Sequence, residues 1–311
     1  MKAEDGVHVD LDELVAYQAV TQQMAVSFPR VTHSLLLGNR PSRLNGRGGA
    51  FDQIRPYLQG DDVRDIDWNV TARMGGAPFV RVFNEERERM LLVLVDQTND
   101  MFFGTREQLK SVLAARTAAQ LLWLAHHRKQ PCGLVIAGEG QVVTCPPRHD
   151  RGHLIRCFMQ LVQANQSLAA REPETRAAVQ LPLALRHLLG LLARDALVVL
   201  VSDFHNFNDE AWLLVDEIAA RTQSLAIPTY DGIMDNWPMQ GQFLATYGGI
   251  AAELQFSSSQ QRQGIQDRAR RNLEALQERI AQAGMAVLPF STYEPAQAQL
   301  SQALSLIGAG R

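Results

Sequence analysis

Two short, continuous apolar runs constrain the fold of this chain more than any other feature. Residues 90–96 read MLLVLVD and residues 196–203 read ALVVLVSD, so each run ends in an aspartate, Asp96 or Asp203. Apolar runs of this length, without polar interruption, are typical of strands that are buried on both faces. The chain must therefore supply helices to cover both sides of a sheet.

Segments with helical apolar spacing alternate with these strands. We expect helices over residues 106–128, 151–164, 176–194, 208–222 and 259–283, and further strands over residues 224–231 and 285–290. Strands that alternate with helices of this length predict an α/β fold with a doubly wound, mostly parallel sheet. Glu139 and Gly140 join two apolar runs, CGLVIAG and QVVTC, which predicts one antiparallel hairpin at the edge of the sheet.

The first part of the chain has a different character. Asp10 and Glu13 form a capping pattern for a helix that would run to about Phe28, where Pro29 ends it. The Gly- and Arg-rich residues 38–50 have no apolar period and predict an irregular loop. We therefore expect a helical and loop-rich N-terminal segment, residues 1–88, packed on a main domain, residues 89–311.

Composition excludes several classes of protein. Hydrophobic residues make up 46% of the chain, enough for a large core, and 30 Lys and Arg against 33 Asp and Glu leave no basic excess for nucleic acid or anionic membranes. The most apolar long window, residues 181–202, is interrupted by charges, so no membrane span is expected. The three cysteines lack the spacing of a disulfide framework or a zinc site, and residues 1–10 lack a signal-peptide pattern. We expect a cytoplasmic protein with reduced thiols.

Residues 57–73, YLQGDDVRDIDWNVTAR, concentrate four carboxylates and two arginines. Asp61 or Asp62 can cap a short helix, Arg64 can pair with a carboxylate, and Trp68 offers a large apolar anchor. Carboxylates with arginines nearby are more easily satisfied as ion pairs than held as catalytic acids. We therefore expect this stretch to clasp the N-terminal segment onto the main domain.

The wider segment resembles the signature of a bacterial family, domain of unknown function fifty-eight. That signature has a glycine-rich turn, the pattern F-x-x-I-R-x-Y-x-x-G-D-D-x-R-x-I-D-W and a following A-R, and then a paired glutamate. The signature positions that we expect to be structural are Arg55, Gly60, Asp61, Arg64, Asp67, Trp68 and Arg73. In the family the signature precedes a von Willebrand factor A-like domain, so the resemblance implies that fold for the main domain.

The resemblance also implies a function. Members of the family are typically encoded beside MoxR-type AAA+ ATPases. The chain is therefore expected to be a non-enzymatic protein-interaction module, an adaptor or co-chaperone-like partner of such an ATPase, which also contacts client proteins.

A-like domains often carry a metal-ion-dependent adhesion site. In such a site the first strand ends in D-x-S-x-S, and a later strand ends in an aspartate. The resemblance assigns these positions to Asp96, Thr98, Asp100 and Asp203. Hard divalent cations prefer oxygen ligands, so Mg²⁺ or Ca²⁺ is the implied cofactor.

The match to the metal site is incomplete. Asp100 replaces a hydroxyl ligand, and Val179 and Gln180 stand where a loop threonine belongs. Asp96 could instead be a turn or helix-capping residue, because aspartate is favoured there regardless of function.

Two alternatives to the interaction module stay open. One is a metal-dependent hydrolase, a phosphatase or nuclease, that uses Asp96, Asp100 and Asp203, with His205 as the nearest candidate base. The other is a metal-free structural scaffold.

Overall fold

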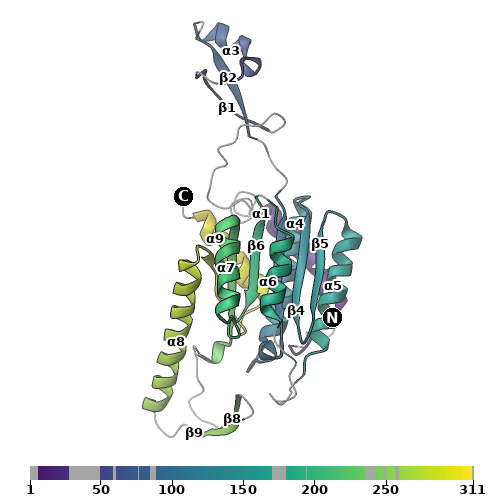
Figure 1. Ribbon diagram of the computed structural model, residues 1–311, viewed down its shortest axis with the longest axis vertical. Coiled ribbons are helices and arrows are strands. Elements are labelled where there is room, and N and C mark those ends of the chain that lie inside the picture. Colours follow the sequence, from purple (N-terminus) through teal and green to yellow (C-terminus); the bar gives the residue numbers. More distant parts are fainter. Residues whose placement is uncertain are drawn as a thin grey trace. The chain divides into compact units, whose positions relative to one another are not determined.

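The computed structural model describes residues 6–27, 50–58, 61–75, 77–84, 89–169, 180–193, 195–234, 242–247, 250–255 and 259–309. The chain divides into two compact units, namely Met1–Gly38 together with Arg89–Arg311, and Asn39–Glu88 (Figure 1). We call the first the larger unit and the second the signature unit. No helix among the described residues is long and apolar enough to cross a membrane.

A mixed, mostly parallel sheet forms the centre of the larger unit. Its strands are β3 (Leu91–Gln97), β4 (Cys132–Gly138), β5 (Val142–Arg148), β6 (Leu197–Ser202), β7 (Gln223–Tyr230), β10 (Ala286–Val287) and β11 (Phe290–Ser291). The strand order is β10-β7-β6-β3-β4-β5, with β11 also paired to β7. Only β5 is antiparallel to its neighbour among these described strands. The predicted α/β fold with an antiparallel edge hairpin is confirmed, and the strand order agrees with an A-like domain.

Helices cover both faces of this sheet (Figure 1). On one face lie α1 (Leu11–Ser27), α4 (Lys110–His127), α5 (Arg151–Gln166) and α9 (Ala296–Ala309). On the other face lie α6 (Leu181–Gly190), α7 (Asp209–Arg221) and α8 (Ser259–Gln282). The sheet is therefore doubly wound, as its uninterrupted apolar strands predict.

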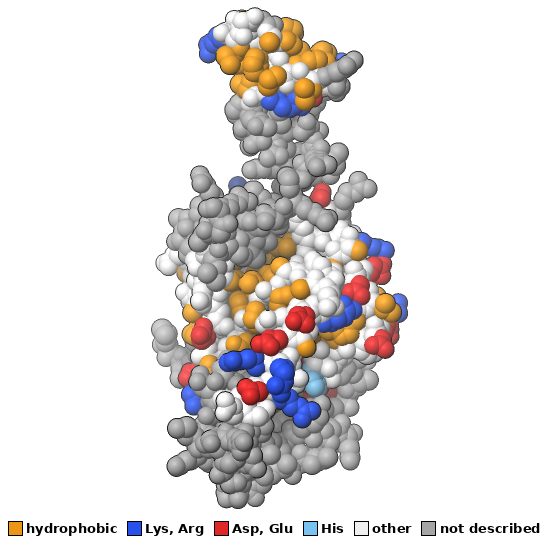
Figure 2. All heavy atoms as spheres, turned by 90° about the vertical axis from the view of Figure 1, so that its left-hand side faces the viewer, with side chains coloured by type: hydrophobic (Ala, Val, Ile, Leu, Met, Phe, Trp, Pro, Cys, Tyr) orange, Lys and Arg blue, Asp and Glu red, His pale blue; other side chains and the backbone are white. Residues whose placement is uncertain are grey.

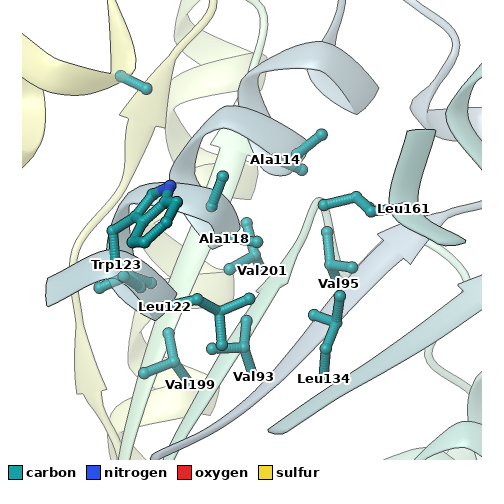
Figure 3. Packing of buried hydrophobic residues seen from close by; sticks show 14 of the residues in the cluster. Val93, Val95, Ala114, Ala118, Leu122, Trp123, Leu134, Leu161, Val199 and Val201 are labelled. Atoms are coloured by element: carbon teal, nitrogen blue, oxygen red, sulfur yellow. The ribbon is translucent and has the colours of Figure 1, made fainter. Parts of the chain in front are cut away.

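Strand β3 divides its side chains between the two cores. All of its residues are buried, and Val93 and Val95 belong to one hydrophobic cluster while Leu92 and Leu94 belong to the other. Figure 3 shows the first cluster, in which the two β3 valines lie beside residues of β6 and of α4 such as Leu122. This alternation follows from the period of two along a strand.

The predicted hairpin forms at β4 and β5. The N–H of Gly138 donates to the carbonyl of Gln141 at 2.9 Å. Gly140 has φ 72°, a left-handed conformation that glycine adopts without a steric penalty. The turn therefore depends on the glycine in the way the sequence indicates.

Helix α1 belongs to the larger unit, whereas the sequence grouped it with the signature segment in residues 1–88. Its start agrees with the expected cap, since the Glu13 N–H donates to Asp10 Oδ1 at 2.7 Å. Trp123 Nε1 on α4 donates to the carbonyl of Leu14 at 2.9 Å, and Arg116 forms an ion pair with Glu13. These contacts join residues about a hundred positions apart, so local spacing could not indicate them.

The signature unit contains β1 (Ala50–Pro56) paired antiparallel with β2 (Phe79–Asn84), the 3-10 turn η1 (Val63–Asp65) and the short helix α3 (Trp68–Arg73). The hydroxyl of Thr71 accepts from the Phe79 N–H at 3.0 Å, which ties α3 to β2. A further hairpin, β8 (Gln242–Tyr247) with β9 (Ile250–Gln255), was not expected from the sequence.

The substitution Trp123→Ala should lower the free energy of unfolding by about 3–5 kcal/mol, because it empties a fully buried indole site and removes the anchor of α1. Chemical denaturation would measure the loss. Leu213→Ala on α7 is the control: that leucine is 69% exposed, so a change below about 0.5 kcal/mol is expected. Equal losses in the two variants would contradict the assigned core.

Candidate functional site at the carboxyl ends of the central strands

The candidate site lies where β3 and β6 end side by side. These strands are parallel neighbours, with Val95 opposite Val201 in register. From β3 the chain passes to β4 and β5 on one side, and then to β6 and β7 on the other. In open α/β sheets, ligands bind at such a switch point, outside the carboxyl ends of the strands. Asp96 near the end of β3 and Asp203 just after β6 lie there together.

Asp96 is the buried centre of the site, with 1% of its surface exposed. Its Oδ1 accepts from the Thr98 N–H at 3.0 Å and from the Thr98 hydroxyl at 2.8 Å. Its Oδ2 accepts from the Ser202 hydroxyl at 2.6 Å, and the oxygen of that hydroxyl accepts from the Phe204 N–H at 2.9 Å. The carboxylate thus joins the loop after β3, through Thr98, to the end of β6, through Ser202.

The environment of Asp96 disfavours its ionised form. Burial, followed by the negative charge of Asp203, raises the pKa of Asp96 to about 6. The hydrogen bonds donated by Ser202 and Thr98 act in the opposite direction but do not cancel this effect.

Asp203 is compensated by a lysine that the sequence analysis missed. Lys110 Nζ forms an ion pair with Asp203 Oδ2, and the two side chains are only 13% and 10% exposed. The other carboxylate oxygen accepts from the His205 N–H at 2.9 Å. His205 takes part in this contact through its backbone N–H, and its side chain is exposed. No sequence signal indicated this role, because the helix expected over residues 106–128 placed Lys110 inside the helix, whereas α4 begins at Lys110.

Asp100 and Asn99 complete the loop after β3. Asp100 accepts a hydrogen bond from the side-chain amide of Asn206, which links this loop to the segment after β6. The Asn99 N–H donates to Glu139 Oε2 at 3.0 Å, which adds the tip of the β4–β5 hairpin. Sequence reasoning missed Asn206 and Glu139 as members of this site, because neither follows a strand-end pattern.

A third strand-end aspartate lies beside these two. Asp231, just after β7, is 1% exposed. It accepts from the Thr105 N–H at 2.8 Å, the Thr105 hydroxyl at 2.7 Å and the Ile233 N–H at 2.8 Å. The segment between β3 and α4 is therefore held at its start by Asp96 and farther along by Asp231.

The predicted metal ligands Asp96 and Asp203 are already engaged by protein groups. Both oxygens of Asp96 and both oxygens of Asp203 already accept hydrogen bonds or an ion pair. The described residues contain no group of three or more His, Cys, Asp or Glu that could hold a metal. Of the positions where a loop threonine belongs, Val179 lies outside the described residues and Gln180 precedes α6 as its cap. Binding of Mg²⁺ or Ca²⁺ stays a prediction.

The signature carboxylates have local structural roles. Asp61 receives two hydrogen bonds from the Arg55 guanidinium, at 2.7 and 2.8 Å, and one from the Leu58 N–H at 2.9 Å. The Arg55 hydrogen bonds, followed by that of Leu58, lower the pKa of the Asp61 carboxyl. Asp62 caps η1, and Asp67 caps α3 by accepting from two backbone N–H groups. The expected capping by Asp61 or Asp62 is thus confirmed at Asp62, and the Asp67 cap was not predicted.

Other signature residues differ from expectation. Arg55, not Arg64, supplies the guanidinium that pairs with Asp61; Arg64 is exposed and has no ion pair among the described residues. Trp68, which was expected to be an apolar anchor of the clasp, has 67% of its surface exposed. Arg73 is exposed in the last turn of α3, and Gly60 lies outside the described residues. The predicted clasp between this segment and the main domain stays a prediction.

Comparisons with known proteins agree with the signature. A family model described as "Protein of unknown function DUF58" matches residues 53–275. "Uncharacterized protein Rv1480" of Mycobacterium tuberculosis (strain ATCC 25618 / H37Rv) and "Uncharacterized protein Mb1516" of Mycobacterium bovis (strain ATCC BAA-935 / AF2122/97) are each 29% identical over 214 residues. Each match covers 68% of this chain and 65% of the relative, so the chain spans less than two thirds of these relatives' length.

Among solved structures, the chain is similar to proximal thread matrix protein 1 from the mussel byssus in two crystal forms. Each similarity has a TM-score of 0.32 and 13% identity and covers 46% of this chain, with 37% and 38% of the other chain covered. The fold assignment rests on the strand order and not on this similarity.

The substitution Asp96→Asn should change the pH dependence of stability. A carboxyl whose pKa is raised on folding stabilises the protein fully at pH values below its unfolded pKa, and this contribution is lost as pH rises through about 6. Relative to wild type, the variant should therefore gain about 2 kcal/mol of unfolding free energy between about pH 4.5 and 7.5.

Denaturant titrations at several pH values would measure this gain. Asp267→Asn, at an exposed position on α8, controls for the loss of one negative charge. A constant difference between Asp96→Asn and wild type across this pH range would show that Asp96 does not titrate as assigned.

Asp67→Ala should destabilise the signature unit by about 0.5–2 kcal/mol, because two N–H groups of α3 lose their acceptor. Faster amide hydrogen exchange in residues 68–73 would report the loss. Asn69→Ala is the matched control, since this exposed side chain lies on the same helix. Unchanged exchange in Asp67→Ala would contradict the capping role.

Proposed function

Because the chain belongs to the family described as "Protein of unknown function DUF58", we propose that it is a non-enzymatic protein-interaction module. It acts as an adaptor or co-chaperone-like partner of a MoxR-type AAA+ ATPase, in the cytoplasm, where such an ATPase finds its nucleotide. The ATPase is proposed as the partner because the signature resembles that of this family. Exposed apolar side chains of the signature unit support an interaction role.

Exposed apolar side chains on the signature unit carry the proposal. Leu58, Val63, Trp68 and Met74 are each more than 60% exposed, at 62%, 61%, 67% and 61%. Figure 2 shows hydrophobic side chains gathered on the visible face of the unit that contains α3. Large exposed apolar groups are costly in water and mark interaction surfaces, and tryptophan is enriched among the residues that dominate binding energy.

The signature unit also holds these side chains on a defined backbone. The Arg55–Asp61 pair, the Asp67 cap and the Thr71–Phe79 hydrogen bond fix the turn, α3 and β2 relative to one another. A preorganised surface loses less conformational entropy on binding than a flexible one. The charged signature residues therefore support the scaffold, and the apolar residues between them are the candidates for contact.

The strand-end site favours an interaction module over a hydrolase. Asp96, Asp100 and Asp203 each accept hydrogen bonds or an ion pair from neighbouring protein groups. A hydrolytic centre would instead direct such carboxylates at a metal, a water molecule or a substrate. The same hydrogen bonds are also compatible with a metal-free structural scaffold. Co-purification with the ATPase distinguishes the scaffold from the interaction module.

Co-purification with the cognate MoxR-type ATPase tests the proposal. The wild-type chain should associate with the ATPase in at least one nucleotide state, measured with and without ATP and Mg²⁺. Trp68→Ala should weaken the association by more than about tenfold, as expected for a central contact residue. Leu213→Ala is the control, because this leucine is equally exposed but lies on α7 of the larger unit.

No association in any nucleotide state would reject the ATPase as partner and leave the scaffold. Association that Trp68→Ala leaves unchanged would reject the signature unit as the contact surface. Metal-dependent turnover of phosphatase or nuclease substrates, lost in Asp203→Ala, would instead establish the hydrolase.

A further inference from the structure

The strand-end site concentrates negative charge in a region with little water. Asp96 is buried, and the side chain of Asp203 is only 10% exposed. Asp100 lies in the turn that follows β3 and is partly buried. Carboxylates removed from water are costly unless an opposite charge or hydrogen-bond donors compensate them. Asp96 is compensated by hydrogen bonds from Thr98 and Ser202, so Asp203 is the carboxylate for which a counter-charge matters most.

We propose that the ammonium group of Lys110 is the resident cation of this site and takes the place of the predicted divalent metal as the counter-charge to Asp203. Lys110 Nζ is paired with Asp203 Oδ2, and the lysine side chain is 13% exposed. Nζ also lies 5.8 Å from the centre of the Phe103 ring, within the range of a cation–π contact. The ammonium thus contacts both a carboxylate and an aromatic face.

The position of Lys110 in its helix supports this role. Lys110 is the first residue of α4, and the preceding cap residue, Leu109, provides no side-chain hydrogen bond. A cation at a helix amino terminus opposes the helix dipole, which favours anions there. Helix formation therefore does not explain a lysine at this position, whereas the pairing with Asp203 does.

The oxygen atoms that a metal would need already accept from protein groups. A divalent cation such as Ca²⁺ or Mg²⁺ takes about six or more oxygen ligands. Here Asp203 is bound by Lys110 and the His205 N–H, and Asp96 is bound by Thr98 and Ser202. A metal that binds Asp203 Oδ2 would have to displace Lys110 or share this oxygen with it. Lysine pairing and metal binding therefore compete for Oδ2 of this carboxylate.

This arrangement has a functional consequence that does not depend on the proposed partner. An adhesion-type metal attracts an incoming carboxylate because it keeps net positive charge, whereas the Lys110 charge is neutralised by Asp203. The site then holds three segments together: the loop after β3, the loop after β6 and the start of α4. It does so without a metal, so chelators should not alter the fold of the wild-type chain.

Calorimetric titration and thermal unfolding with Mg²⁺ or Ca²⁺ would test the inference on the full chain. Wild type should show neither saturable heat nor a shift in Tm at about 10 mM metal, which is above the range of weak protein sites. Lys110→Met frees the Asp203 carboxylate and should gain metal binding, with a rise in Tm of about 3–8 °C at that concentration. Lys110→Arg keeps a cation and should behave like wild type.

The variant Lys110→Met/Asp203→Asn separates the pair from general destabilisation. It lacks both charges and should fold without gaining metal binding. If Lys110→Met alone fails to fold while the double variant folds, the need for a counter-charge is supported by that result. Saturable Mg²⁺ or Ca²⁺ binding by wild type would overturn the inference, and so would a folded Lys110→Met that binds no metal.

Discussion

The burial of β3 on both faces is the constraint on which the larger unit depends. Its side chains alternate between two hydrophobic clusters, one with α1, α4, α5 and α9 and the other with α6, α7 and α8. A strand in this position must be apolar along its length, so a polar residue is tolerated only where the strand ends. Asp96 lies at that end, and its carboxylate is buried because the sheet continues on both sides of β3.

A buried carboxylate at this point has to be satisfied by neighbours, and the protein supplies them from three elements. Ser202 at the end of β6 and Thr98 in the loop after β3 donate hydrogen bonds to Asp96. Lys110 at the start of α4 forms an ion pair with Asp203. The same contacts join the loops that in other α/β proteins form binding sites. The edge of the sheet is consequently a hydrogen-bonded junction as well as a candidate site.

In the signature unit, aspartates stabilise local turns and helix starts instead of joining distant strands. Asp61, Asp62 and Asp67 each accept hydrogen bonds from backbone N–H groups or from a nearby arginine. The many carboxylates of this stretch therefore stabilise turns and helix starts. Local capping of this kind stabilises short elements that lack a core of their own. Apolar residues such as Trp68 are left at the surface, where they suit contact with another molecule.

The sequence alone determined what depends on neighbouring residues: the alternation of strands and helices, the Gly140 hairpin, the Asp10 cap and the cap at Asp62. These features follow from periodicity, backbone freedom and hydrogen bonds over a few positions. Only the tertiary structure decided that Lys110 pairs with Asp203, 93 residues away, and that Arg55 rather than Arg64 pairs with Asp61. The identity of an ion partner depends on which side chains packing brings within a few ångströms, and many charged residues of this chain could satisfy the same carboxylate.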